Sequence, residues 1–414
     1  MCTNLLISVP SNPGSTDPVP MYVSARALEL PGALAQSVYV MASGQQWPLP
    51  LPPSSNSPVQ GWTTLGWTST YGFVGIAGTD SWTSVPTFND GINSEGLSVG
   101  ALWLAPGTEY APLGMGTNQV SFYDFPAWIL GNFATVEEVR TALDEITVVG
   151  PPPPTATESS PLYVPLHYIV TDSTGQSLVV EFIGGKAIHY ASDRGVLTNW
   201  PTYDWHATNV KNYFNLTPFG TATSPTGAGD PGGGGLLGLP GDPLSVSRFV
   251  KAWVLSQGIG QLPANGAGWL PAPGGFDVTP PPKNPPPPGY AGPEQTAVTV
   301  AQQLVQICMG TPYGMLLVKV ENSPETTGTP ATDPPTYTPG YGDYTMWTTV
   351  RDHTNRKYYF NPAFSGLLTQ VDLTRIDFAT TPSYPNSLNV PVVPQPGVQW
   401  CLDATPQLAA PVSS

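Results

Sequence analysis

Met1-Cys2-Thr3-Asn4 begins the chain and leads through apolar, strand-forming residues to Val9 and Pro10. If Met1 is removed, Cys2 carries both a thiol and a free α-amine. A cysteine thiol has a reference pKa of about 8.5 and an α-amine one of about 7.7–8.0, so one residue can supply a nucleophile and the base that accepts its proton. This stretch predicts a strand that presents an N-terminal nucleophile, although a cysteine in this position also starts ordinary strands.

Strand and helix patterns alternate along the rest of the chain. β-prone runs bounded by Gly, Pro and Asn predict a meander of antiparallel strands over 3–9, 21–28, 36–42, 62–79 and 97–104. Helical spacing and N-capping residues predict helices over 121–133, 135–146, 204–214, 245–255 and 295–309. Further strands are expected over 167–171, 177–183, 186–190, 344–351, 357–360 and 367–371. This order implies an α+β fold of two sheets with helices outside.

The composition excludes several classes of partner. With 13 basic and 28 acidic residues among 414, the net charge is 13 − 28 = −15, and such a surface repels nucleic-acid phosphates and anionic lipid headgroups. No apolar run approaches the roughly 18 residues of a membrane span, so no membrane insertion is expected. Cys2, Cys308 and Cys401 form neither a CxxC pair nor a close cluster with the four histidines, so no metal and no cofactor are expected.

The sequence gives less information about domain organisation and cellular compartment than about partners. We expect one domain over 1–414 with Pro/Gly-rich surface inserts near 223–243, 263–293 and 323–339, since such stretches cannot form a packed core. One disulfide, Cys308 to Cys401, could form and would leave the thiol of Cys2 unpaired. A native start at Met1 implies a cytoplasmic protein, whereas a leader removed before Cys2 implies a periplasmic or secreted one.

Several separated pieces of the chain resemble one family and follow its order. They are Met1-Cys2-Thr3, Arg26-Ala27-Leu28-Glu29, Asp90-Gly91-Ile92-Asn93-Ser94-Glu95-Gly96-Leu97, Leu197-Thr198-Asn199-Trp200-Pro201-Thr202-Tyr203-Asp204-Trp205, Ser247-Arg248-Phe249-Val250, and Thr345-Met346-Trp347-Thr348 with Lys357-Tyr358-Tyr359-Phe360. The set resembles the choloylglycine hydrolases, that is, conjugated bile acid hydrolases and penicillin V acylases, over roughly 2–373. Ala101-Leu102-Trp103-Leu104 resembles the Gram-negative branch of that family.

The resemblance implies an N-terminal nucleophile hydrolase fold, a four-layer αββα sandwich of two antiparallel sheets flanked by helices. It makes Cys2 the nucleophile and its α-amine the base. Arg26 stands where the family places a cation beside the thiol, which favours the thiolate. Glu29 stands where the family usually has an aspartate that bonds the α-amine, and its alternative is an exposed carboxylate at a strand end.

The resemblance also assigns the groups that stabilise the reaction's oxyanion. Asn199 matches the asparagine whose side-chain amide donates to it, and a backbone N–H near Trp103 is the expected second donor. Arg248 matches a second arginine near the nucleophile, the alternative being an arginine on a helix surface. Asn93 and Gly96 are expected to fix a turn between strands.

Trp103 and Trp200 lie next to the two expected oxyanion donors and suggest an aromatic wall for an apolar acyl group. The expected activity is therefore hydrolysis of linear, non-peptide amides, like that of penicillin V acylases and extending to N-acyl-homoserine lactones. The alternatives are conjugated bile salt hydrolysis and a catalytically silent binding protein on the same scaffold. The partner is a small N-acyl amide, and the resemblance implies a homotetramer.

Overall fold

The computed structural model describes residues 1–11, 19–30, 35–51, 62–78, 85–153, 163–192, 194–216, 235–260, 292–309, 344–362, 365 and 367–392. The insert expected at 323–339 lies outside these residues, as do 223–234 and 263–291 of the other two inserts and Cys401.

Two antiparallel sheets dominate the described part of the chain. The smaller has the spatial order β1 (Cys2–Pro10), β2 (Pro20–Leu30), β14 (Tyr344–Asp352), β15 (Lys357–Pro362) and β16 (Thr369–Asp372). The larger has the order β13 (Lys186–Ala191), β12 (Ser177–Ile183), β11 (Leu166–Thr171), β8 (Ser98–Trp103), β7 (Thr87–Asn93), β6 (Phe73–Gly78), β3 (Gln36–Met41) and β17 (Asn389–Pro391). Two short pairs accompany them, β4 (Gln46–Trp47) with β5 (Trp67–Thr68) and β9 (Gln119–Ser121) with β10 (Thr147–Val149).

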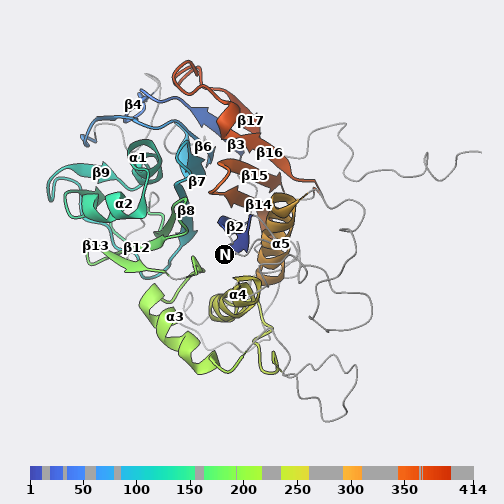
Figure 1. Ribbon diagram of the computed structural model, residues 1–414. Coiled ribbons are helices and arrows are strands. Elements are labelled where there is room, and N and C mark those ends of the chain that lie inside the picture. Colours follow the sequence, from blue (N-terminus) through green and yellow to red (C-terminus); the bar gives the residue numbers. More distant parts are fainter. Residues whose placement is uncertain are drawn as a thin grey trace, which may run out of the picture.

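Helices cover the outer faces of both sheets. In Figure 1, α1 (Phe125–Asn132) and α2 (Val136–Ala142) lie on the side of the larger sheet, and α4 (Ser245–Gly260) and α5 (Pro293–Cys308) lie against β1, β2 and β14 of the smaller one. A third helix, α3 (Tyr203–Asn209), continues into a 3₁₀ turn, η1 (Val210–Tyr213), and another such turn, η2 (Leu373–Arg375), follows β16. The described residues thus form the expected α+β sandwich, with layers in the order helix, sheet, sheet, helix.

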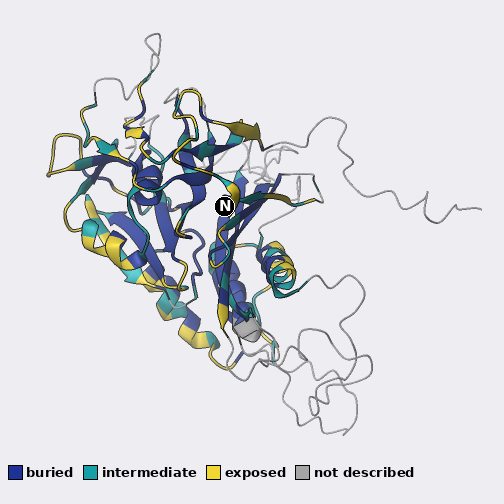
Figure 2. Cartoon of the chain, turned by 45° about the horizontal axis from the view of Figure 1, so that its top comes forward, coloured by how far each residue is buried: buried dark blue, intermediate teal, exposed yellow. Residues whose placement is uncertain are grey.

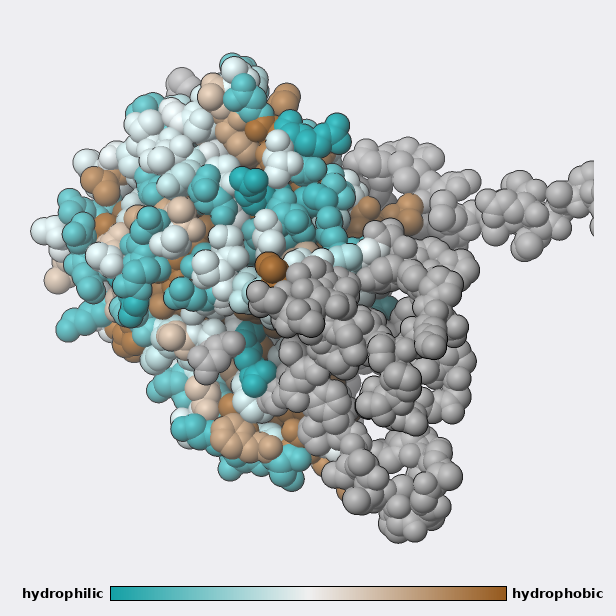
Figure 3. All heavy atoms as spheres, in the orientation of Figure 1, coloured by the Kyte–Doolittle hydropathy of each residue, from teal (hydrophilic) through white to brown (hydrophobic). Residues whose placement is uncertain are grey.

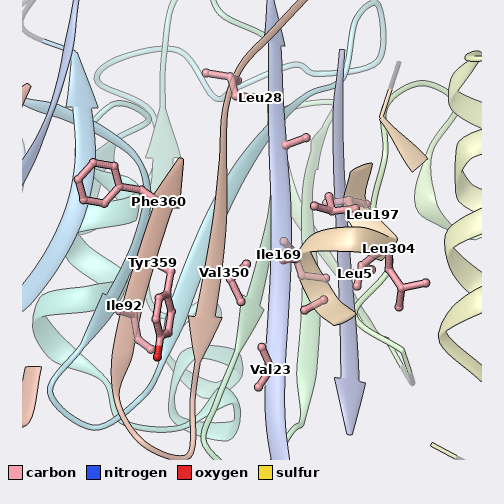
Figure 4. Close-up of a cluster of buried hydrophobic side chains, with 14 of the residues drawn as sticks. Leu5, Val23, Leu28, Ile92, Ile169, Leu197, Leu304, Val350, Tyr359 and Phe360 are labelled. Carbon is pink, nitrogen blue, oxygen red and sulfur yellow. The ribbon is translucent and has the colours of Figure 1, made fainter. Parts of the chain in front are cut away.

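Alternating side chains explain why the sheets stack. Thr3, Leu5 and Ile7 of β1 are all buried, and Thr3 lies against α5, where its hydroxyl contacts the Cys308 carbonyl (3.3 Å). Successive residues of a strand point to opposite faces, so Cys2 and Asn4, which alternate with these residues, face the larger sheet. Figure 2 shows most strands buried and the exposed residues on outer loops and helix faces, and Figure 4 shows apolar side chains of the buried cluster on neighbouring strands.

The predicted single meander is wrong. β2 and β3 follow each other in sequence but lie in different sheets, because the far edge of β2 pairs with β14 near the other end of the chain. β3 pairs instead with β6 and β17. Local strand patterns carry no information about a partner some 320 residues away, so this long-range pairing was not predictable from them.

Two helices are shorter than expected. The helix predicted from residue 121 begins at Phe125, because Ser121 belongs to β9 and pairs with Val149 of β10. The next helix begins as predicted, with a capping box between Thr135 and Glu138, but it ends at Ala142 rather than near residue 146. Both differences concern boundaries, where propensity is weakest.

The turn between β7 and β8 confirms the role expected for Asn93 and Gly96. The side-chain oxygen of Asn93 accepts hydrogen bonds from the N–H groups of Glu95 and Leu97, both at 3.0 Å. Gly96 has φ +86°, and a Cβ atom there would lie 2.4 Å from the carbonyl oxygen of His353. Both residues are therefore needed for the shape of the turn.

Asp124, which precedes α1, leads to a prediction about stability. It is buried, its Oδ2 has no hydrogen-bond partner among the described residues, and burial raises its pKa from 3.8 to about 8. The folded protein therefore holds this proton at pH values where the unfolded chain releases it, so stability falls as pH rises from about 4 to about 8. Asp124→Asn should remove this fall, which at about 1.4 kcal/mol per pKa unit amounts to several kcal/mol.

Urea unfolding of both proteins between pH 5 and pH 9 measures this effect. Asp144→Asn, a change at an exposed aspartate, is the matched control and should follow the unmodified protein at every pH. Parallel stability curves for Asp124→Asn and the unmodified protein would show that Asp124 is ionised in the folded state.

Candidate active site

The edge of β1 that does not pair with β2 brings Cys2 and Asn199 together. Asn4 and Leu197 form an antiparallel bridge in which each N–H donates to the carbonyl of the other, at 2.8 and 3.1 Å. Continued for two residues, this register sets Asn199 opposite Cys2. Cys2 is 2% and Asn199 8% exposed. Backbone pairing thus places the expected nucleophile beside the expected oxyanion donor.

The side-chain amide of Asn199 is held in one orientation. Its oxygen accepts hydrogen bonds from the backbone N–H of Cys2 (2.9 Å) and from Nη2 of Arg248 (2.7 Å). Its nitrogen donates to the carbonyl oxygen of Trp103 (2.7 Å). Because two donors face the oxygen, the amide nitrogen must point toward β8, and the contact with Trp103 uses one of its two hydrogens.

Arg248 of α4 ties the helix to the start of β1. Its guanidinium donates to the hydroxyl of Thr3 (2.6 Å), to the carbonyl of Cys2 and to the carbonyl of Pro243 (2.8 Å), besides Asn199. It is 0% exposed, which excludes the alternative of an arginine on a helix surface. Because the planar guanidinium of Arg248 donates to several fixed acceptors at once, it positions Cys2 and Asn199 relative to each other.

The strand ladder also directs the backbone N–H of Trp103. The N–H of Leu104 donates to Pro165 in the segment that leads into β11 (2.8 Å). Successive residues of a strand point these groups to opposite sides, so the N–H and C=O of Trp103 point away from β11. Since this C=O accepts from Asn199, the N–H of Trp103 points to the Asn199 side of β8.

The indole rings of Trp103 and Trp200 are accessible, with 40% and 44% of each residue exposed. The Trp200 ring lies against Gly107, where a Cβ atom would come within 2.6 Å of the ring. Large apolar side chains that stay this exposed beside a buried polar cluster can receive an apolar ligand.

Arg26 lies on the same face of the sheet as Cys2, because it is paired with Asn4 in the β1–β2 ladder. Its guanidinium forms a buried ion pair with Asp90 (3.0 Å), donates to the carbonyls of Asn89 (2.9 Å) and Ala101, and lies 4.9 Å from the ring centroid of Trp347. These contacts connect the smaller sheet to β7 and β8. The effect of this cation on the Cys2 thiol stays a prediction.

Asp90 gathers a polar cluster between the two sheets. Besides Arg26, it accepts a hydrogen bond from Tyr358 (2.9 Å) and lies 3.6 Å from Arg351, which also donates to Asn4. Burial raises the pKa of Tyr358 well above its usual value and lowers that of Arg351. One carboxylate thus compensates two buried guanidinium groups, and removing it would leave both uncompensated.

Glu29 is buried at the end of β2, so the alternative of an exposed carboxylate is excluded. Its backbone pairs with that of Met1, with the Glu29 N–H donating to the Met1 carbonyl at 2.7 Å. Its side chain accepts a hydrogen bond from Thr345 (3.4 Å). Glu29 therefore adjoins the residue whose removal would expose the Cys2 amine, and its bond to that amine stays a prediction.

The remaining observations concern the second described cysteine, possible metal ligands, the helices and the surface. Cys308 is a free thiol, and burial raises its pKa to about 12. No group of three or more His, Cys, Asp and Glu side chains within the described ranges could hold a metal ion. Among the helices that the structure describes, none is long and apolar enough to cross a membrane. Figure 3, in the orientation of Figure 1, shows mainly polar and near-neutral residues on the described surface that faces the viewer, with apolar residues in small groups.

Several residues of the site were not identified from the sequence. Thr3, Ser245, His167, His206 and Asp90 reach it through tertiary contacts, and the histidines follow no local spacing rule. Thr3 and Asp90 lie inside quoted motifs and His206 and Ser245 lie beside them, which was the one available signal, whereas His167 lies near none of the motifs.

Comparison with known proteins gives a consistent set of matches. The model of the family described as linear amide C-N hydrolases, choloylglycine hydrolase family, matches residues 51–261. This range includes Trp103, Asn199, Trp200 and Arg248 and begins after Cys2.

Individual relatives extend this match. The chain is 38% identical over 174 residues to a bile salt hydrolase/transferase from Clostridium perfringens, covering 40% of this chain and 51% of that protein. It is 27% identical over 323 residues to a penicillin V acylase from Pectobacterium atrosepticum, covering 76% and 70%. The fold resembles a crystal structure of a conjugated bile acid hydrolase variant from C. perfringens, with a TM-score of 0.62, 21% identity and coverage of 91% and 94%. The chain thus matches only about half the length of the first of these curated relatives.

Proposed function

The chain belongs to the choloylglycine hydrolase family of linear amide C-N hydrolases, and from this premise we propose that it hydrolyses a small N-acyl amide with Cys2 as nucleophile. The observation that carries the proposal is the register that sets Asn199 opposite Cys2, with Arg248 bonded to both.

With Cys2 as nucleophile, the reaction proceeds in two steps, acylation of the sulfur and hydrolysis of the thioester. Once Met1 is removed, the α-amine of Cys2 accepts the thiol proton, and the sulfur attacks the carbonyl carbon of the substrate. Asn199 Nδ2 and the backbone N–H of Trp103 donate to the oxyanion. The C–N bond then breaks as the ammonium group protonates the departing amine, which leaves a thioester. Water, deprotonated by the same amine, releases the acid and restores Cys2.

Arg26 and Glu29 support these steps in the proposal. Arg26 supplies positive charge on the Cys2 face of the sheet, and Glu29 accepts a hydrogen bond from the newly exposed amine. We further propose that the chain is a single domain over 1–414 and that the active form is a homo-oligomer, a tetramer by analogy with the family.

Apolar acyl groups fit the exposed indole faces of Trp103 and Trp200 best. We therefore place penicillin V and N-acyl-homoserine lactones first as substrates, in agreement with the long match to a penicillin V acylase. Conjugated bile salts are the second candidate, favoured by the higher identity to a bile salt hydrolase/transferase over a shorter segment. A binding protein without activity would share the scaffold but would not release any acid.

Acid release from the three substrate types tests this ranking. Each methylene group that the indoles cover is worth about 0.8 kcal/mol, so kcat/KM for acyl-homoserine lactones should rise about fourfold per methylene until the wall is covered. Trp103→Ala should flatten this dependence but keep residual cleavage, because the backbone N–H remains.

Phe214→Ala, which removes another exposed aromatic ring, should leave the chain-length dependence unchanged. A clear preference for conjugated bile salts would reverse the ranking of substrates, and no acid release from any of them would favour the binding protein.

A further inference from the structure

Two buried histidines hold consecutive backbone carbonyls at the oxyanion donor. Nε2 of His167, on β11, lies 3.1 Å from the carbonyl oxygen of Thr198, and Nε2 of His206, on α3, lies 2.9 Å from that of Asn199. A carbonyl oxygen can only accept, so each ring must carry its hydrogen on Nε2. Both histidines are 0% exposed.

His167 is itself fixed by a carboxylate. Its Nδ1 lies 3.1 Å from Oε1 of Glu181, which also accepts the backbone N–H of Tyr203 at 2.9 Å. Together with the Thr198 carbonyl at Nε2, this contact fixes the plane of the His167 ring.

His206 is held by packing instead. Its ring stacks on Phe249 of α4, with centroids 4.6 Å apart and planes 9° from parallel. Burial lowers its pKa to about 4, so the ring is neutral near pH 7 and its single hydrogen is on Nε2. Its Nδ1 has no hydrogen-bond partner among the described residues, so the contact with Asn199 is the ring's one described hydrogen bond.

The backbone of Asn199 is thereby fixed on both sides. Its N–H donates to the hydroxyl of Ser245 at the start of α4 (2.9 Å), and its C=O accepts from His206. We infer that His167 and His206 are positioning residues that hold the Thr198–Asn199 backbone and so aim the Asn199 amide at the reacting carbonyl. This inference rests on the proposed function, because it explains how one of the proposed oxyanion donors is placed.

The expected effect is on the transition state. Oxyanion donors act at hydrogen-bond distance, and a displacement of about 1 Å can reduce the rate on the order of a hundredfold. Loss of a positioning ring should therefore lower kcat and leave KM nearly unchanged. Alkylation of Cys2 by iodoacetamide needs no oxyanion donor, so its rate should not change.

Paired substitutions separate a hydrogen bond from mere bulk. The amide nitrogen of glutamine reaches about as far as Nε2 of histidine, and that of asparagine about as far as Nδ1. His206→Gln and His167→Gln therefore keep the donor to the carbonyl, whereas His206→Phe and His167→Asn remove it. His189→Phe, on β13 and outside this cluster, is the control.

Turnover and alkylation give the first test. His206→Phe and His167→Asn should lose roughly tenfold to a hundredfold in kcat. The two glutamine variants should stay within a few-fold of the unmodified protein, and His189→Phe should match it. Equal losses in the glutamine and donor-removing variants would overturn the inference, as would kcat losses that parallel slower alkylation and a lower Tm.

Hydrogen exchange gives a second test that does not need activity. Peptides covering 196–203 should exchange faster in His206→Phe and His167→Asn than in the matching glutamine variants. Unchanged exchange in all four variants would overturn the inference even if the protein is an amidase. An unmodified protein that cleaves no amide would instead overturn the proposed function, while exchange would still decide whether the rings hold this segment.

Discussion

Cys2→Ala is expected to abolish amide hydrolysis, with a loss in kcat on the order of 10⁶-fold. The substitution removes the sulfur but keeps the backbone groups through which this residue contacts Asn199 and Arg248. The variant should therefore fold, with a Tm within a few degrees of the unmodified protein. Initial rates with penicillin V, or with whichever substrate the unmodified protein cleaves fastest, measure the effect.

Cys308→Ala is the matched control, since Cys308 is the other free thiol of the described residues. Burial raises the pKa of this thiol to about 12, so almost none of it is thiolate near pH 7, and its loss should leave kcat unchanged. The assignment would be wrong if Cys308→Ala stopped turnover while Cys2→Ala retained it.

Asn199→Ala should have the second largest effect, a decrease in kcat of roughly a hundredfold to a thousandfold with little change in KM. The amide hydrogen that it removes acts on charge that develops only in the transition state. Steady-state kinetics over a range of substrate concentrations separates the two constants.

Alanine also removes the acceptor of a buried arginine, so a second variant is needed. Asn199→Asp keeps an oxygen for Arg248 and for the Cys2 N–H but has no amide hydrogen to donate. It should lose kcat like Asn199→Ala, again with little change in KM. A change confined to KM in both variants would make Asn199 a substrate-binding residue instead.

Local signals in the sequence predicted the elements better than their partners. The run from Cys2 to Pro10 and the acidic start of the helix after Thr135 are visible in adjacent residues, and both elements form. The pairing of β2 with β14 depends on residues some 320 positions apart, and the strand pattern of neither segment specifies the other. The order of the strands within the sheets could therefore not be predicted from the sequence and is known from the structure.

The same holds for the candidate site, where the sequence indicated several residues but not their contacts. Motif order brought Cys2, Asn199 and Arg248 into one hypothesis, and the structure places these three in contact. The effect of Arg26 on the thiol stays a prediction, and its guanidinium also bonds across the sheets to Asp90, a partner that no spacing rule could indicate. The sequence gives no identifiable partner for the histidines that hold Thr198 and Asn199. Their partners are backbone carbonyls, which every residue has.

Mass spectrometry of the protein during turnover can detect the acyl group on Cys2 itself. Intact mass gives the state of the N-terminus, and fragmentation of protein quenched in acid locates the acyl group. The proposed mechanism requires that active protein lacks Met1 and that a transient acyl group is bound to the sulfur of Cys2 as a thioester. Active protein that retains Met1, or an acyl group bound to another residue, would contradict it.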